Sequence, residues 1–233
     1  MRFGFVALFL GLTALVTGQS VPVNDWLVVP GVRVGPITAT TVRADMKRLF
    51  PQSTVAEDEL ELDEGMVFPA TMVARETQTE SLAIVWTGKA ADAHPKQVFM
   101  CRGRRRVACN WHAVGVGGDI APGVKLLDLE TMNGKPFTIH GFGWGYGGNV
   151  ESWDGGRMEK LDCHRSLSIA LDGERGRDGE FTTQLTDDEK ISFSGNRSVS
   201  TTTPALRKLN PAVTEILFIF PAGDLKACGP ASR

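Results

Sequence analysis

The chain has little net charge, and it lacks the short motifs of several large enzyme classes. Its 25 Lys and Arg residues nearly balance 27 Asp and Glu residues, which leaves a net charge of −2. This balance gives no electrostatic reason to expect binding to nucleic acid or to anionic membranes. The sequence holds no phosphate-binding loop and no H-E-x-x-H motif, so it does not indicate a nucleotide-binding enzyme or a zinc protease of that type.

The sequence also lacks the spacing of common metal and nucleophile sites. No two cysteines form a C-x-x-C pair, and Cys163 lies directly beside His164, so in a strand the two side chains would point to opposite faces. Ser168 lacks the flanking glycines of a hydrolase nucleophile elbow. Pairing of Cys163 with a histidine as nucleophile and base has no support in the local sequence. We therefore predict no metal site and no cofactor.

Long apolar runs are absent after the N-terminus. Arg2 precedes the apolar segment Phe3–Val16, and Val16-Thr17-Gly18 provides a cleavage site. This segment is shorter than the roughly 20 residues that span a bilayer. We predict a signal peptide at residues 1–18, with an uncleaved anchor as the alternative, and no transmembrane segment after cleavage. The mature protein is then exported, to the periplasm or beyond the cell.

Export predicts that the four cysteines form disulfides. The segment "VFMCRGRRRVACNW" contains two β-like runs around a polar tip centred near Arg105, which places Cys101 opposite Cys109 across a hairpin. The remaining pair is then Cys163 and Cys228. The alternative is that all four are buried free thiols.

Two segments of the chain share a layout. They are "GPITATTVRADMKRLFPQSTV" from Gly35 and "GDIAPGVKLLDLETMNGKPFTI" from Gly118. Each contains a glycine, a polar stretch, an amphipathic helix, a turn breaker and β-like sequence. The first helix should end at Pro51 and the second at Asn133-Gly134. The predicted apolar helix stripes are Val42, Met46, Leu49 and Phe50, then Leu126, Leu129 and Met132.

Strands are expected after each helix, and the spacing of the two segments suggests a duplicated subdomain rather than a solenoid. We predict an α+β fold with antiparallel sheets and helices packed on one face. The first α+β repeat covers residues 19–112. The second covers residues 113–233 and ends in a helix after Thr203 and a buried strand at Val213–Phe220. The expected strands are 55–62, 65–74 and 81–86 in the first repeat, then 136–146, 150–154 and 161–171 in the second.

The polar, glycine-rich stretch Asp172–Gly195 predicts an exposed hairpin or loop between the second repeat and its C-terminal extension.

The repeated layout resembles the tandem-repeat fold of the β-lactamase-inhibitor-protein family. It is also similar to the unit of the outer-membrane-assembly lipoproteins, but the chain has no lipobox cysteine, which argues against a membrane-anchored assembly role. The resemblance covers Val32 to Leu171. It implies an antiparallel sheet with helices on one face and an open second face that can contact a partner. Separately, "LLDLETMNGKPFTIHGFGWGYGGNVESWDGG" resembles a signature of uncharacterised exported bacterial proteins, which implies no particular activity.

The candidate binding site lies in "FTIHGFGWGYGGNVESWDGG", residues 137–156. In a strand, residues of one parity share a face, so the rings would lie on one face and the glycines on the other. A turn near Gly148 would bring the return strand alongside. Exposed, such rings would form a binding patch, and buried, they would be core. The predicted binding residues are His140, Phe142, Trp144, Tyr146 and Trp153.

Other charged groups give weaker hypotheses. Glu151 and Asp154 could serve as an acid/base pair on a glycan, but in a strand their spacing points them to opposite faces. The arginine cluster could bind an anion, although a solvated hairpin tip is the favoured interpretation. Its members are Arg102, Arg104, Arg105 and Arg106.

The sequence thus predicts an exported, non-enzymatic binding protein of the bacterial envelope. Its aromatic hairpin would contact a protein or an envelope component. The alternatives are a hydrolase of cell-wall glycan or peptide, and a purely structural domain.

Overall fold

The computed structural model describes residues 25–62, 65–74, 81–101, 109–162, 165–172 and 185–221. The predicted signal peptide at 1–18, the arginine cluster (Arg102, Arg104, Arg105 and Arg106), and Cys163 and Cys228 lie outside these ranges. The described residues form helices and mainly antiparallel sheets, which confirms the α+β class.

The largest sheet has six strands in the order β12-β14-β7-β6-β5-β4, and every neighbouring pair is antiparallel. Because β6 is fully buried on both faces, its sequence is a continuous apolar run rather than an alternating one. The interior strand predicted at Val213–Phe220 is confirmed as β14, between β12 and β7. The bounds are β4 Thr54–Glu61, β5 Val67–Ala74, β6 Leu82–Trp86, β7 Pro95–Met100, β12 Leu167–Asp172 and β14 Ala212–Ile219.

A five-stranded sheet of short strands has the order β3-β2-β1-β8-β9. Its β1–β8 pair is parallel, which departs from the antiparallel pattern of the other ladders in the described ranges. This pairing joins the start of the described chain to a segment far along the sequence. The bounds are β1 Leu27–Val29, β2 Arg33–Val34, β3 Ile37–Thr38, β8 His112–Val114 and β9 Asp119–Ile120.

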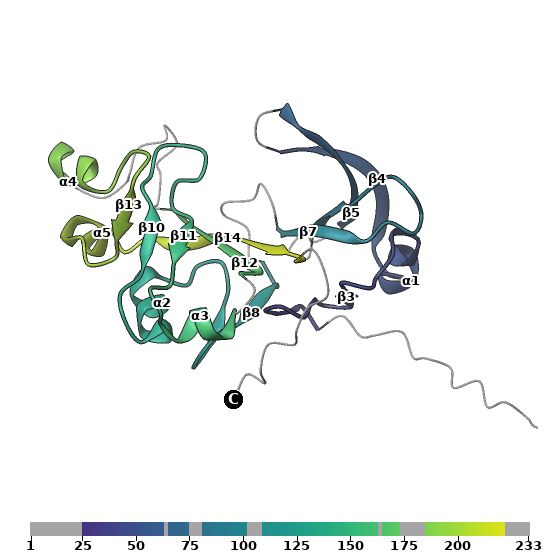
Figure 1. The fold of residues 1–233 in the computed structure, drawn as a ribbon, viewed down its shortest axis with the longest axis horizontal. Coiled ribbons are helices and arrows are strands. Elements are labelled where there is room, and N and C mark those ends of the chain that lie inside the picture. The colour runs from purple at the N-terminus through teal and green to yellow at the C-terminus, as the bar shows by residue number, and fades with distance from the viewer. Residues whose placement is uncertain are drawn as a thin grey trace, which may run out of the picture.

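A three-stranded sheet of order β11-β10-β13 carries the candidate site. Figure 1 shows this sheet with α2, α3, α4 and α5 on one side of the molecule, whereas β4, β5 and α1 form the other side. Strands β12 and β14 lie between them. The bounds are β10 Thr138–His140, β11 Val150–Ser152, β13 Ser198–Ser200, α1 Met46–Leu49, α2 Leu126–Asn133, α3 Arg157–Leu161, α4 Asp187–Ser192 and α5 Pro204–Leu209.

One large apolar core connects the three sheets. It includes Trp86, Trp111, Phe137 and Phe218, each at most 1% exposed. The buried indole N–H of Trp86 donates to the Thr71 hydroxyl at 2.8 Å, so this polar group keeps a partner inside the core. Burial of these large rings supplies much of the stabilisation that holds the short strands together.

The helices match their sequence signals in part. Helix α2 stops where predicted, at Gly134, whose φ of +81° is the left-handed conformation of a helix C-cap. Helix α5 begins at Pro204 after Thr203, as predicted. The first helix is shorter than predicted, since a 3₁₀ turn at Arg43–Asp45 precedes the four-residue α1.

The strands of the first half lie close to their predicted positions, as does β11, predicted at 150–154, but the other two strands predicted after the second helix do not. The prediction of a strand over 136–146 is wrong beyond His140, where β10 ends. The predicted strand 161–171 begins only at Leu167, and Leu161 still belongs to α3, which Asp162 caps. The loop predicted over 172–195 contains helix α4. After His140, backbone partners from residues 193–197 replace a regular ladder.

The six-stranded sheet takes β4 to β7 from residues 19–112 and β12 and β14 from residues 113–233. The two predicted repeats therefore share one sheet and do not form separate ones. The duplication itself, and the family resemblances, stay predictions.

Candidate functional site

The candidate site is the loop between β10 and β11, which we call the glycine loop (residues 141–149). Two backbone hydrogen bonds join the two ends of the loop. His140 N–H donates to the Asn149 carbonyl, and Gly148 N–H donates to the His140 carbonyl, both at 2.9 Å. Within it, Gly147 N–H donates to the Trp144 carbonyl at 2.9 Å. The loop is therefore a folded structure with internal hydrogen bonds.

Strand β10 ends at His140 because the next residues take partners from the segment after α4. Gly141 N–H donates to the Arg197 carbonyl at 2.8 Å, and Phe142 N–H donates to the Phe193 carbonyl at 3.0 Å. Gly195 N–H returns a bond to the Phe142 carbonyl at 2.8 Å. In Figure 1 the glycine loop and α4 lie at the same end of the molecule.

Close backbone approach explains the glycines at the base of the loop. A Cβ atom at Gly148 would lie 2.0 Å from the Leu171 carbonyl oxygen and 2.8 Å from Cε1 of Phe142, and the residue has a φ of +84°. No other residue fits there without moving backbone. At Gly145, in contrast, an added Cβ would meet nothing within 4 Å.

Two of the predicted binding rings belong to the core. Phe142 is 2% exposed and Trp153 is 8% exposed. Phe142 packs edge-on against Phe193 with ring centroids 5.8 Å apart, and Trp153 packs against Phe137 at 4.9 Å. The expected single face of rings is therefore divided, because Phe142 and Trp153 are buried.

A buried side-chain amide links the two ends of the segment "NGKPF…SWDGG". The side-chain amide of Asn133, 1% exposed, donates to the Trp153 carbonyl at 2.9 Å, and its Oδ1 accepts from Met158 N–H at 3.2 Å. A Cβ atom at Gly156 would lie 2.0 Å from this Oδ1. Asn133 thus ties α2 to the chain that enters α3, which gives these residues a structural role.

The remaining rings form a small cluster, which we call the tip cluster: His140 at the end of β10, and Trp144 and Tyr146 in the glycine loop. The His140 and Trp144 ring centroids lie 5.7 Å apart with planes at 89°, and Trp144 and Tyr146 lie 5.4 Å apart at 75°. Tyr146 is 49% exposed and Trp144 is half-buried. These three residues are the part of the predicted site that the structure brings together near solvent.

The indole N–H of Trp144 has an unusual environment. Its Nε1 atom is buried and has no hydrogen-bond partner among the described residues. A buried donor left unpaired costs about 1–3 kcal/mol. Phenylalanine would fill much of the same space without this cost, so packing alone does not explain the choice of tryptophan.

The two acidic residues considered for glycan chemistry have separate neighbours. Glu151 Oε2 lies 3.9 Å from His140 Nδ1, and both side chains are about one-third exposed. Asp154 instead accepts a hydrogen bond from the Thr138 hydroxyl at 2.8 Å. The carboxylate beside the tip cluster is therefore that of Glu151.

Helix α4, which the sequence prediction missed, supports the loop. Thr186 N–H donates to the Glu189 carboxylate at 2.7 Å, and Glu189 N–H donates to the Thr186 hydroxyl at 3.3 Å. The Thr186 amide, together with Lys208, holds the pKa of Glu189 below its ordinary value. This reciprocal cap is visible in the sequence as Thr-x-x-Glu and could have located the helix.

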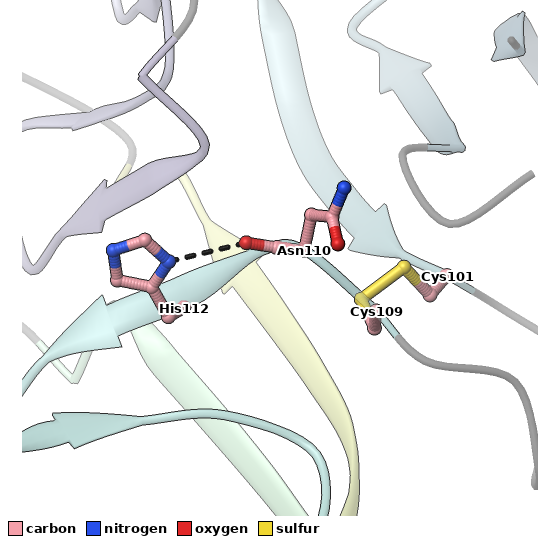
Figure 2. Close-up of a disulfide and its surroundings, with 4 residues drawn as sticks. All are labelled: Cys101, Cys109, Asn110 and His112. Carbon is pink, nitrogen blue, oxygen red and sulfur yellow. Dashed lines mark hydrogen bonds between the residues drawn. A yellow bond between two sulfur atoms is a disulfide. The ribbon is translucent and has the colours of Figure 1, made fainter. Parts of the chain in front are cut away.

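The predicted Cys101–Cys109 disulfide is present (Figure 2). Its Cα atoms lie 6.0 Å apart, and it joins the end of β7 to the segment that enters β8. Nearby, His112 Nδ1 forms a 3.1 Å hydrogen bond with the Asn110 carbonyl, and His112 Nε2 lies 3.6 Å from Asp119 Oδ2. A disulfide is typical of proteins in oxidising compartments.

Within the ranges that the structure describes, no three His, Cys, Asp or Glu side chains are grouped as a metal site requires. The helices of those same ranges are all too short or too polar to cross a membrane. We compared the chain with protein-family models, with curated proteins and with solved structures. No family model, curated protein or solved structure matches it.

Proposed function

We propose that this chain is an exported, non-enzymatic binding protein of the bacterial envelope, and that it contacts a protein or envelope component through the tip cluster. The observation that carries the proposal is the half-exposed ring of Tyr146, stacked edge-on against Trp144 on a hydrogen-bonded loop. Tyrosine and tryptophan are the side chains most enriched at binding hot spots, because each gives a large contact area with few rotatable bonds.

Assigning structural roles to the neighbouring residues sharpens this proposal. Phe142 and Trp153 are core, and Gly141 and Gly148 are fixed by close backbone contacts. In the tip cluster, Tyr146 is 49% exposed, and His140 and Trp144 are partly exposed. The proposed binding residues are therefore His140, Trp144 and Tyr146.

Export is supported by two features. The N-terminal apolar run has the length and flanks of a signal peptide. The Cys101–Cys109 disulfide is of the kind typical of oxidising compartments.

Site-specific photo-cross-linking tests the proposal. A benzoylphenylalanine is placed at Tyr146 and, as a matched control, at Met66, which is 52% exposed in the turn between β4 and β5. In envelope extract, we expect a discrete adduct from position 146 alone. Excess wild-type protein should suppress the adduct, and excess Tyr146→Ala protein should not.

Equal adducts from both positions, or none from position 146, would contradict the proposal. Turnover of isolated envelope material that disappears in Glu151→Gln would favour the hydrolase alternative instead.

A further inference from the structure

We infer that the tip cluster binds a cation, the alkylammonium or guanidinium group of a basic protein segment, in the corner between Trp144 and Tyr146 and beside Glu151. This inference rests on the proposed function, because it names the chemistry that the same site recognises. Three observations carry it: the angle between the rings, the open space around Trp144, and the sign of the neighbouring charge.

The rings meet nearly at right angles. Trp144 and Tyr146 have an interplanar angle of 75° with centroids 5.4 Å apart. Two planes at this angle border a corner, and the Tyr146 ring on one side of it is 49% exposed. The face of an aromatic ring is its negative side, so a corner of two faces attracts a compact cation from two directions.

The loop leaves space beside these rings. Gly143 and Gly145 flank Trp144 in the sequence, and a Cβ atom added at either would meet nothing within 4 Å. The backbone on both sides of Trp144 is therefore open at these two positions. Gly143, Gly145 and Tyr146 are all exposed, so this part of the loop faces solvent.

The charge next to the cluster is negative. Glu151 Oε2 lies 3.9 Å from His140 Nδ1, and the His140 ring packs edge-on against Trp144. The nearby cation Arg197 is directed elsewhere, since its guanidinium donates to the Ile191 carbonyl. A cation at the corner thus gains from the Glu151 carboxylate as well as from the ring faces, whereas an anion would be repelled.

A neutral sugar is the other ligand that aromatic side chains commonly bind. Sugars stack on one flat ring face, and the two perpendicular rings do not offer an extended flat platform. A sugar would also gain little from a carboxylate's charge. The geometry therefore favours a cation, and an oligosaccharide serves as a comparison ligand in the experiment.

The experiment is an NMR titration of the mature protein with tetramethylammonium chloride, followed through the tryptophan indole N–H signals. Sodium chloride at equal ionic strength controls for screening, and tert-butanol controls for size without charge. We expect a saturable shift of the Trp144 signal, which Trp144→Phe identifies by its loss. The signals of Trp86 and Trp111, at most 1% exposed, should stay in place.

Two variants separate the contributions. Tyr146→Ala should weaken tetramethylammonium binding about fivefold or more, and Glu151→Gln about threefold, in keeping with cation–π and carboxylate contributions at a partly exposed site. Unchanged signals elsewhere in each spectrum show that the fold is intact.

Equal shifts with tert-butanol, saturation by a chitooligosaccharide instead, or no shift with tetramethylammonium would overturn the cation assignment. In those cases, cross-linking at position 146 would still support the proposed function. Loss of that cross-link would remove the proposed function as well.

Discussion

The base and the tip of the glycine loop use the same residue types for opposite purposes. At the base, an added Cβ atom at Gly148 would lie 2.0 Å from a backbone oxygen, and the ring of Phe142 is buried. At the tip, an added Cβ atom at Gly145 would meet open space, and the ring of Tyr146 is half exposed. Glycine and aromatic side chains therefore build a fixed support in one part of the loop and an accessible cluster in the other.

This difference shows why the composition of the loop is a poor guide to its role. Alternating rings and glycines have two readings in sequence, a core hairpin or a binding platform. The structure combines both. Residues 193–197 and Leu171 form backbone hydrogen bonds with the base of the loop, at Gly141, Phe142 and Gly148. The neighbours of each residue, and not its type, decide whether it supports or binds.

The largest expected effect comes from replacing one glycine with alanine in each part of the loop, Gly148 at the base and Gly145 at the tip. Gly148→Ala should destabilise the protein by about 4 kcal/mol or more, because the methyl group collides with backbone at a residue with φ of +84°. Gly145→Ala should change stability by less than about 0.5 kcal/mol. Urea unfolding measures both values. Similar destabilisation by the two substitutions would show that the base and the tip do not differ.

The second prediction compares a core ring of the same hairpin, Trp153, with the exposed ring of the tip, Tyr146. Trp153→Ala should cost about 3–5 kcal/mol, because it removes a ring that is 8% exposed and packed on Phe137. Tyr146→Ala should cost less than about 1 kcal/mol, since its ring is 49% exposed. Thermal unfolding of both variants checks this. A stable Trp153→Ala protein would contradict the assignment of this ring to the core.

The third prediction concerns the polar contacts that hold the opposite end of the hairpin, after β11. Asn133→Ala should cost about 2–3 kcal/mol, because it leaves the Trp153 carbonyl and the Met158 N–H without their partner inside the protein. Thr131→Ala serves as the control on the same helix, since Thr131 is exposed and its hydroxyl bonds only within α2. Chemical denaturation of the two variants gives the difference. Equal costs would mean that Asn133 does not hold this end of the hairpin.

The smallest effect concerns α4, which supports the loop. The pKa of Glu189 is held below its ordinary value of 4.5, first by the Thr186 amide. A lowered pKa means that the cap stabilises α4 above the ordinary value and is lost as pH falls through the lowered one. The Thr186 amide chemical shift should therefore titrate with a midpoint below 4.5, and Glu189→Gln should abolish the step. A midpoint at or above 4.5 would contradict this cap.

Local signals in the sequence located the regular parts of the fold. The apolar run at Val213–Phe220 became an interior strand, and Asn133-Gly134 ended α2 as predicted. The cysteine spacing around Arg105 predicted the Cys101–Cys109 bond. These features depend on propensity and spacing over a few residues, which a single sequence displays.

The candidate site was only partly predictable, for a physical reason. A period of two indicates a strand when alternate side chains need burial, but glycines bury no side chain and leave the pattern ambiguous. The end of β10 depends on Phe193 and Arg197, and the conformation of Gly148 depends on Leu171. Such contacts between distant segments are not encoded in the loop itself. The cluster of His140, Trp144 and Tyr146 was included in the predicted set, whereas the burial of Trp153 was not foreseen.

The central claim is that the tip contacts the partner and the base supports the tip. The most direct measurement compares the affinities of the Tyr146→Ala variant and the wild type for the partner that cross-linking recovers. The unfolding midpoints of both proteins are measured as a control for stability. We predict a loss of at least about tenfold in affinity, as expected for an aromatic hot spot, with the midpoint unchanged. Wild-type affinity in this folded variant would contradict the claim.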